Sequence, residues 1–174
     1  MSLWEDPQGG LHDDMDGAAL TLASWPANRG VVLTELTDAQ VAALQTPTLT
    51  QVQAQQTAVL SAACQAQIYA GFTSSALGRP YSYPAQDTDQ MNLASSVLSS
   101  LLPNLAAGWT TPFKCADSNG VWASRDHTAA QIQQVGLDGK AAILAAMAQN
   151  AALAAQVAAT TTNAAAQAIV WPAS

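Results

Sequence analysis

The sequence predicts a helix-rich α+β fold, in which short β-hairpins pack against helices and a long helix lies near the C-terminus. Apolar residues recur at helical spacing before Gly71 and after Asp87, whereas the stretch FTSSALGRPYSY between them has the alternation and the turn of a hairpin. The chain has 174 residues, which is enough to bury a core. Only 10% of its residues are charged and 49% are hydrophobic, which favours burial of surface in a homo-oligomer through helix packing.

Residues 1–46 are predicted to form a small unit made of a hairpin, a strand and a helix. Trp4 and Leu11 flank a turn that contains proline and glycine, which supply the backbone angles of a tight turn. The strand is expected in VVLTEL, residues 31–36. The sequence TDAQ that follows is a capping box, so a short helix is expected to end near Gln45.

A connecting helix is predicted over residues 47–70. Its apolar stripe is thin and is interrupted by many glutamines; the stripe consists of Leu49, Val52, Val59, Ala63 and Ala66. Small and polar side chains suit a helix that packs closely on copies of itself. They suit a satellite helix on a monomer equally well, and the sequence leaves both alternatives open.

Residues 71–174 are predicted to form a C-terminal α+β domain with two hairpins. A helix follows the first hairpin over residues 89–102, with Asp87 or Thr88 as its cap and Gln90 as the capping-box partner of Asp87. The apolar face of this helix is expected to be Met91, Val97, Leu98, Leu101 and Leu102. The second hairpin falls in residues 109–125. Aromatic residues of the two hairpins are expected to form one core, with an aromatic ligand groove as the alternative: Phe72, Tyr81, Tyr83, Trp109, Phe113 and Trp122.

The longest predicted helix begins at the capping box of residues 128–131 and ends near Ala159. Apolar positions recur in it at gaps of three and four residues, close to a heptad seam that includes Asn150. We hypothesise an oligomer interface made of Ile143, Met147, Asn150, Leu153 and Val157. The alternative is a long helix on a globular body, with Asn150 at the solvent edge.

Two further features of the C-terminal part carry structural predictions. Gly136 and Gly139 weaken the first part of the long helix, which predicts a bend near residues 137–138. The tail, residues 164–174, is expected to add a short helix and to dock the indole of Trp171 on the body.

The sequence shows no constellation of catalytic or metal-binding residues. It lacks the nucleophile-elbow, phosphate-loop and zinc-protease motifs, and its Cys and His residues lack zinc spacing. The acidic run at 13–16 has the wrong order for a calcium loop, and Asp126–His127 is interpreted as the start of a helix. Cys64 and Cys115 are expected to be reduced and partly buried, with a disulfide as the alternative. We therefore predict no enzymatic activity, no cofactor and no metal.

Charge and hydropathy exclude two classes of partner. A net charge of −7 leaves no basic face for nucleic acid. The longest apolar stretches, such as residues 141–148, fall short of the roughly 20 residues of a bilayer span, and the N-terminus lacks the character of a signal peptide. The protein is expected to start in the cytoplasm of the producing cell, with no membrane partner.

Seven motifs run through residues 68–171: IxAGFTSSALG, YxY, DxDQxNL, WTTPF, GVW, HTAAQIQQxGxDGK and VWP. Together they resemble a domain of unknown function found in small tail proteins of tailed bacteriophages. The N-terminal hairpin, VxLT at residues 31–34 and the alanine-rich helix at 39–44 are similar to the N-terminal part of phage tail-fibre assembly proteins.

The resemblance implies a non-enzymatic virion structural protein that docks at a junction of tail fibre and baseplate. The alternative that it implies is an assembly chaperone, which binds the fibre and aids its folding or trimerisation. Tail-fibre or baseplate proteins are the implied partners, a trimer is the favoured homo-oligomer, and the virion tail is the implied location. The residues expected to contact a partner are Tyr81, Tyr83, Asp87, Asp89 and Gln90.

Overall fold

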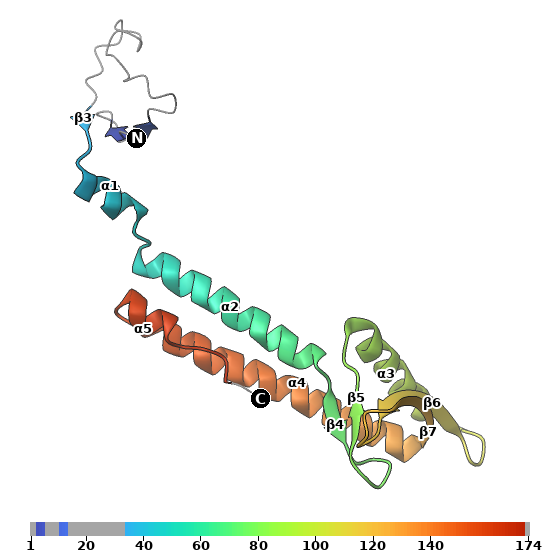
Figure 1. Ribbon diagram of the computed structural model, residues 1–174. Coiled ribbons are helices and arrows are strands. Elements are labelled where there is room, and N and C mark those ends of the chain that lie inside the picture. Colours follow the sequence, from blue (N-terminus) through green and yellow to red (C-terminus); the bar gives the residue numbers. More distant parts are fainter. Residues whose placement is uncertain (1–2, 6–10, 14–33, 173–174) are drawn as a thin grey trace, which may run out of the picture. The chain divides into compact units, whose positions relative to one another are not determined.

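The structure is a computed structural model that describes residues 3–5, 11–13 and 34–172. It confirms the α+β class, with a small antiparallel sheet and a long C-terminal helix (Figure 1). The chain divides into two compact units, Met1–Thr48 and Leu49–Ser174. The helix that follows residue 48 therefore belongs to the same compact unit as the C-terminal elements.

The first unit contains a three-stranded antiparallel sheet. β1 (Leu3–Glu5) lies between β2 (Leu11–Asp13) and β3 (Thr34–Glu35). The predicted hairpin and strand are confirmed for these residues. The hairpin turn, residues 31–33 of the expected strand and most of the acidic run at 13–16 lie outside the described residues.

Helix α1 (Asp38–Gln45) begins with the predicted capping box. The Thr37 hydroxyl accepts a hydrogen bond from the Gln40 backbone N–H at 3.3 Å, and the Thr37 N–H donates to the Gln40 side chain at 2.9 Å. Two N–H groups that the helix itself leaves unsatisfied thus gain acceptors, which is why a four-residue sequence signal places this helix start correctly.

The second unit is built on two antiparallel helices, α2 (Leu49–Tyr69) and α4 (Ala129–Ala158), which lie side by side (Figure 1). Near one end the Gln53 side-chain amide donates to the Val157 carbonyl at 3.2 Å. Further along, the Cys64 thiol donates to the Ala146 carbonyl at 3.5 Å. From the first hydrogen bond to the second, the residue number in α2 increases and that in α4 decreases, so the two helices run in opposite directions.

The buried stripe of α2 differs from the predicted one. Leu60 and Cys64 are buried with Val52, whereas Val59 is 53% exposed and Ala66 is exposed. The face that packs on α4 and α5 (Asn163–Gln167) includes Gln56, whose amide donates to a backbone carbonyl of the C-terminal segment at 2.7 Å. Because a glutamine stands inside the buried face, apolar spacing alone places the stripe wrongly.

The sheet of the second unit has four antiparallel strands in chain order, which confirms both predicted hairpins. These are β4 (Phe72–Ser74), β5 (Tyr81–Tyr83), β6 (Thr110–Ala116) and β7 (Trp122–Thr128). Side chains alternate between the two faces of a strand, so only one face of each long strand can pack on the helices.

The core of the sheet is aromatic, as predicted, but Trp122 is not part of it. Tyr81, Tyr83 and Phe113 are buried together with residues of α3 and α4, and Phe72 and Trp109 pack against them in part. Trp122 is 48% exposed and its ring is covered by the Lys114 ammonium at 5.6 Å. Trp122 and Lys114 occupy alternate positions to the buried residues of their strands, so they point to the opposite face of the sheet.

Helix α3 (Asp87–Ser100) begins one residue earlier than the capping box predicted. Gln86 is the N-cap, and its backbone N–H donates to the Asp89 carboxylate at 3.1 Å. Asp87, the predicted cap, is instead the first helical residue and accepts a hydrogen bond from the Tyr69 hydroxyl at 2.7 Å. Gln90 donates to the Ala85 carbonyl at 2.8 Å rather than to a cap.

The bend predicted at residues 137–138 is wrong, because α4 is continuous from Ala129 to Ala158. Its two glycines serve close packing instead. A Cβ atom on Gly136 would lie 2.8 Å from the Val97 side chain, and one on Gly139 would lie 2.8 Å from the Phe72 ring. The helix cost of each glycine, about 1 kcal/mol, is offset by the close approach of α3 and of the sheet core.

The C-terminal tail docks as predicted. Trp171 packs against a second buried cluster, which consists of Val52, Leu60, Val157 and Ala166. Cys64 and Cys115 are both free and buried, so the structure has no disulfide between them and buries them more fully than expected.

Candidate docking surface

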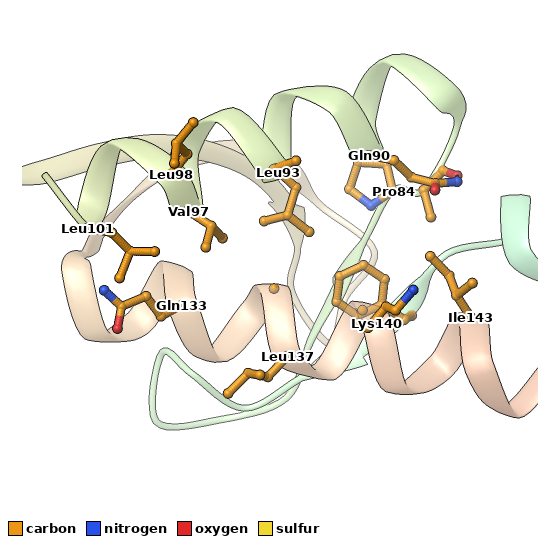
Figure 2. Close-up of a pocket in the computed structure, with 15 residues that line it drawn as sticks. Pro84, Gln90, Leu93, Val97, Leu98, Leu101, Gln133, Leu137, Lys140 and Ile143 are labelled. Atoms are coloured by element: carbon orange, nitrogen blue, oxygen red, sulfur yellow. The ribbon is translucent and has the colours of Figure 1, made fainter.

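A groove of about 680 Å³ lies between α3 and α4 (Figure 2). Figure 2 shows Leu93 and Val97 pointing from α3 toward α4, with Leu101 and Gln133 toward one end and Gln90 and Ile143 toward the other. We call it the α3–α4 groove and define it by its principal lining residues: Leu93, Val97, Leu98, Leu101, Gly136, Leu137, Lys140 and Ile143. Among all its lining residues Lys140 is the one charged side chain, so the groove is an apolar surface with a single cation.

Packing of α3 on α4 fixes the shape of this groove. Val97 sits against Gly136, where a larger residue would push the helices apart. The Gln133 amide donates to the Ser100 hydroxyl at 3.1 Å and ties the C-terminal end of α3 to α4. The floor is therefore a rigid helix contact, as in preformed binding sites.

Of the apolar face predicted for α3, Val97 packs inward and the other four residues do not. The buried residues are Leu93, Ser96 and Ser100, whereas Leu98 and Leu101 are 66% and 63% exposed, and Met91 and Leu102 are exposed as well. Small serines let α3 approach its neighbours closely, which rotates the large apolar side chains outward. This rotation leaves two leucines at the open side of the groove, where the sequence predicted core residues.

A second apolar feature continues from the groove along α4. Leu137, Lys140, Leu144, Met147 and Ala151 are all exposed and follow one another at intervals of three, four, three and four residues. We call these five residues the α4 strip. They lie on one side of the helix, since such spacing keeps side chains on one face.

The hypothesised oligomer seam is divided between different surroundings. Val157 is fully buried and Leu153 packs beside it in the second buried cluster. Ile143 lines the groove, and Met147 is exposed on the α4 strip. The seam residues therefore do not form one free face, because α2 and the tail of the same chain cover the part near residues 153–157.

Asn150 lies on the inner side of α4. Its side-chain oxygen is buried and has no hydrogen-bond donor within the described part of the chain. Asn150 lies along α4 between Ala146 and Val157, whose carbonyls accept hydrogen bonds from α2. The same antiparallel register places Asn150 level with Leu60 of α2. A buried acceptor without a partner costs about 1–3 kcal/mol of stability, so Asn150 weakens the α2–α4 contact. It also places a polar group at one fixed position of that contact.

The residues predicted to contact a partner are also divided. Tyr81 and Tyr83 are buried in the sheet core, so the expectation that they lie at the surface is wrong. Asp87 is exposed and Asp89 is half-buried at the first turn of α3, where they accept hydrogen bonds from Tyr69 and from the cap. Gln90 reaches the rim of the groove.

A second heptad pattern at residues 137–151 is the signal that would have indicated the α4 strip.

Asp126–His127 lies at the end of β7, directly before the N-cap Thr128 of α4, as predicted for a helix entry. His127 is fully buried, and its Nδ1 donates to the Arg125 carbonyl at 2.8 Å, which leaves Nε2 to accept from the Tyr83 hydroxyl at 2.9 Å. Burial lowers the pKa of His127 and raises the pKa of Tyr83. The pair is thus a neutral, structural hydrogen bond.

The buried His127 predicts a loss of stability in mild acid. The unfolded chain binds a proton near pH 6.5 while the folded chain resists it, so the free energy of unfolding should fall as the pH drops below about 6.5. The slope is limited to about 1.4 kcal/mol per pH unit, since one proton is involved. NMR titration of the His127 ring measures this directly, and a midpoint at or above 6.5 would contradict it.

Within the described residues, no group of three or more His, Cys, Asp or Glu side chains could hold a metal ion.

α4 has the length and apolar composition of a membrane-crossing helix, and only 11% of its most apolar 18-residue window is buried. The expectation that no stretch reaches that length is therefore wrong. Such a helix is weak support for a membrane span, since core helices of other proteins have the same composition.

The acidic charge of the chain is unevenly distributed. Residues 1–48 hold seven of the twelve carboxylates and one of the five cations, so they carry −6, whereas residues 49–174 carry only −1. The unit that contains the groove and the strip is thus nearly neutral. Two such surfaces can meet without strong repulsion.

Comparison with known protein families gives one match. Residues 51–170 match the family described as a domain of unknown function (DUF4376). No curated protein and no solved structure matches the chain. The match covers α2 through the C-terminal tail, and therefore all of the α3–α4 groove and the α4 strip.

Proposed function

The chain belongs to the DUF4376 family, and from this premise we propose that it is a non-enzymatic structural protein of a phage tail, which docks at a junction of tail fibre and baseplate. The family description states no role. Support for the proposal comes from the motif resemblance to small phage tail proteins and from the exposed apolar surface of α3 and α4.

The observation that carries the proposal is the α3–α4 groove. Helices at the surface of a monomer normally turn polar residues outward, yet here Leu98, Leu101 and Leu137 face solvent around an apolar cleft. Grooves between helices take the apolar face of a partner helix or segment. Lys140 at the rim would favour a partner segment that carries a carboxylate.

An assembly chaperone is the second candidate. Its support is the N-terminal resemblance to tail-fibre assembly proteins and the concentration of negative charge in residues 1–48. A chaperone would use the same groove transiently, and it would leave before or after the fibre is complete. The two candidates differ in whether the protein stays on the particle.

Quantitative mass spectrometry of salt-washed particles of the phage that encodes the chain separates these candidates. A structural protein should be present at a small fixed multiple of three or six copies, measured against the major tail protein. Absence from particles, with abundant protein in the infected lysate, would overturn the structural role and favour the chaperone.

A further inference from the structure

We propose that two copies of the protein pair through the α4 strip. Leu137, Leu144 and Met147 are each more than half exposed, and they project from a helix whose opposite side is already covered by α2. The strip lies in the nearly neutral unit and carries no carboxylate. This inference concerns the purified protein and does not depend on the phage role.

The spacing of the strip indicates a helix as its occupant. Alternating gaps of three and four residues from residue 137 to 151 define a heptad seam, the pattern of helices that pack with knobs in holes. The same spacing continues through small alanines at residues 154 and 158. Small residues let two helix backbones approach closely, so a second α4 fits the strip better than an irregular segment.

The exposed area of the strip indicates how tight the pair is. Its large apolar residues, Leu137, Leu144 and Met147, present on the order of 300 Å² of apolar surface. A standard interface buries about 800 Å² on each partner, so the strip supports a weak pair that forms at high protein concentration.

The single charge of the strip indicates an antiparallel pair. In a parallel pair in register, the two Lys140 ammonium groups would face each other across the seam and repel. In an antiparallel pair centred on Leu144, Leu137 of one copy lies level with Ala151 of the other. The two-fold axis then passes beside Leu144, and the two Lys140 residues are about 12 Å apart along the helices, since each residue of an α-helix rises 1.5 Å. The second charged residue of α4, Asp138, is outside the strip and is held by the Gln134 amide at 2.8 Å.

Sedimentation equilibrium of the full-length protein tests the pairing. The wild type should sediment as a dimer at high protein concentration, and the double variant Leu144→Gln/Met147→Gln should raise the dimer dissociation constant at least tenfold. Both side chains are exposed, so this variant should keep the wild-type circular dichroism spectrum. Neither residue lines the α3–α4 groove, so partner docking at the groove is tested separately.

Two controls distinguish the strip from other apolar positions. Val59→Gln changes an equally exposed residue on α2 and should leave the dimer unchanged. Asn150→Leu fills the inner side of α4 with an apolar group; it should raise the melting temperature without changing the mass in solution. A dimer weakened by either control as much as by the strip variant would overturn the assignment.

Disulfide trapping tests the orientation. Both native cysteines are buried, so Leu144→Cys and Ala151→Cys each add one accessible thiol. The antiparallel pair predicts rapid cross-linking at position 144 and little at 151, because only the first lies near the axis. The proposal would be overturned by a monomeric or trimeric wild type, or by equal cross-linking at both positions. It would also be overturned if the protein stayed monomeric and bound phosphatidylglycerol vesicles.

Discussion

Replacing Phe113 with alanine is expected to lower the free energy of unfolding by about 3–5 kcal/mol. Phe113 is 2% exposed and its ring packs edge-on to His127 and obliquely to Tyr83. The substitution leaves a cavity among aromatic rings that the hydrogen bond between Tyr83 and His127 holds in place. Urea unfolding followed by circular dichroism measures the change.

Trp122→Ala is the matched control for this substitution. Trp122 is also an aromatic residue of the second hairpin, but it lies on the outer face of the sheet and loses mainly its contact with Lys114. We expect a change below about 1 kcal/mol. Equal losses for the two variants would contradict the division of the sheet into a buried and an exposed face.

Replacing Leu60 with alanine is expected to cost about 2–5 kcal/mol. Leu60 is 1% exposed and belongs to the cluster that joins α2 to the end of α4 and to the tail. Its neighbour Val59 is exposed, so Val59→Ala should change the free energy of unfolding by less than about 0.5 kcal/mol. Thermal unfolding of the two variants compares them, and a larger loss for Val59→Ala would restore the stripe that the sequence predicted.

Local signals in the sequence predicted the elements of the fold well. The capping boxes before α1 and α4 predict both starts, because each depends on hydrogen bonds between residues three apart. The turn at Asp117–Gly120 predicts the β6–β7 hairpin, and the Asp117 carboxylate accepts backbone hydrogen bonds from Asn119 and Val121 there. These features form within a few residues and need no information from the rest of the chain.

Which face of each helix is buried could not be predicted in the same way. In α3 the inward residues include Ser96 and Ser100, since close packing favours small side chains over apolar ones. In α4 the glycines that appear to weaken the helix are the positions where Val97 and Phe72 come closest. Such choices depend on the shape of a neighbouring element, which apolar spacing does not contain.

The sequence did not predict the candidate site because the buried faces of α3 and α4 were predicted wrongly. Leucines assigned to the core of α3 line the open groove, and the heptad of α4 that was assigned to an oligomer lies partly under α2. Three members of the predicted sets reach the surface features described here: Gln90 and Ile143 at the groove, and Met147 on the α4 strip. The apolar face that remains free could be located only after the internal contacts were known.

Hydroxyl-radical footprinting tests most directly whether the α3–α4 groove is a docking surface in the tail. Oxidation of Leu98 and Leu101 would be measured in the isolated protein and in salt-washed particles, with exposed Trp122 as the internal control. The proposed docking predicts that oxidation of both leucines falls several-fold in particles while that of Trp122 is unchanged. Leucines that are oxidised equally in both samples would contradict it.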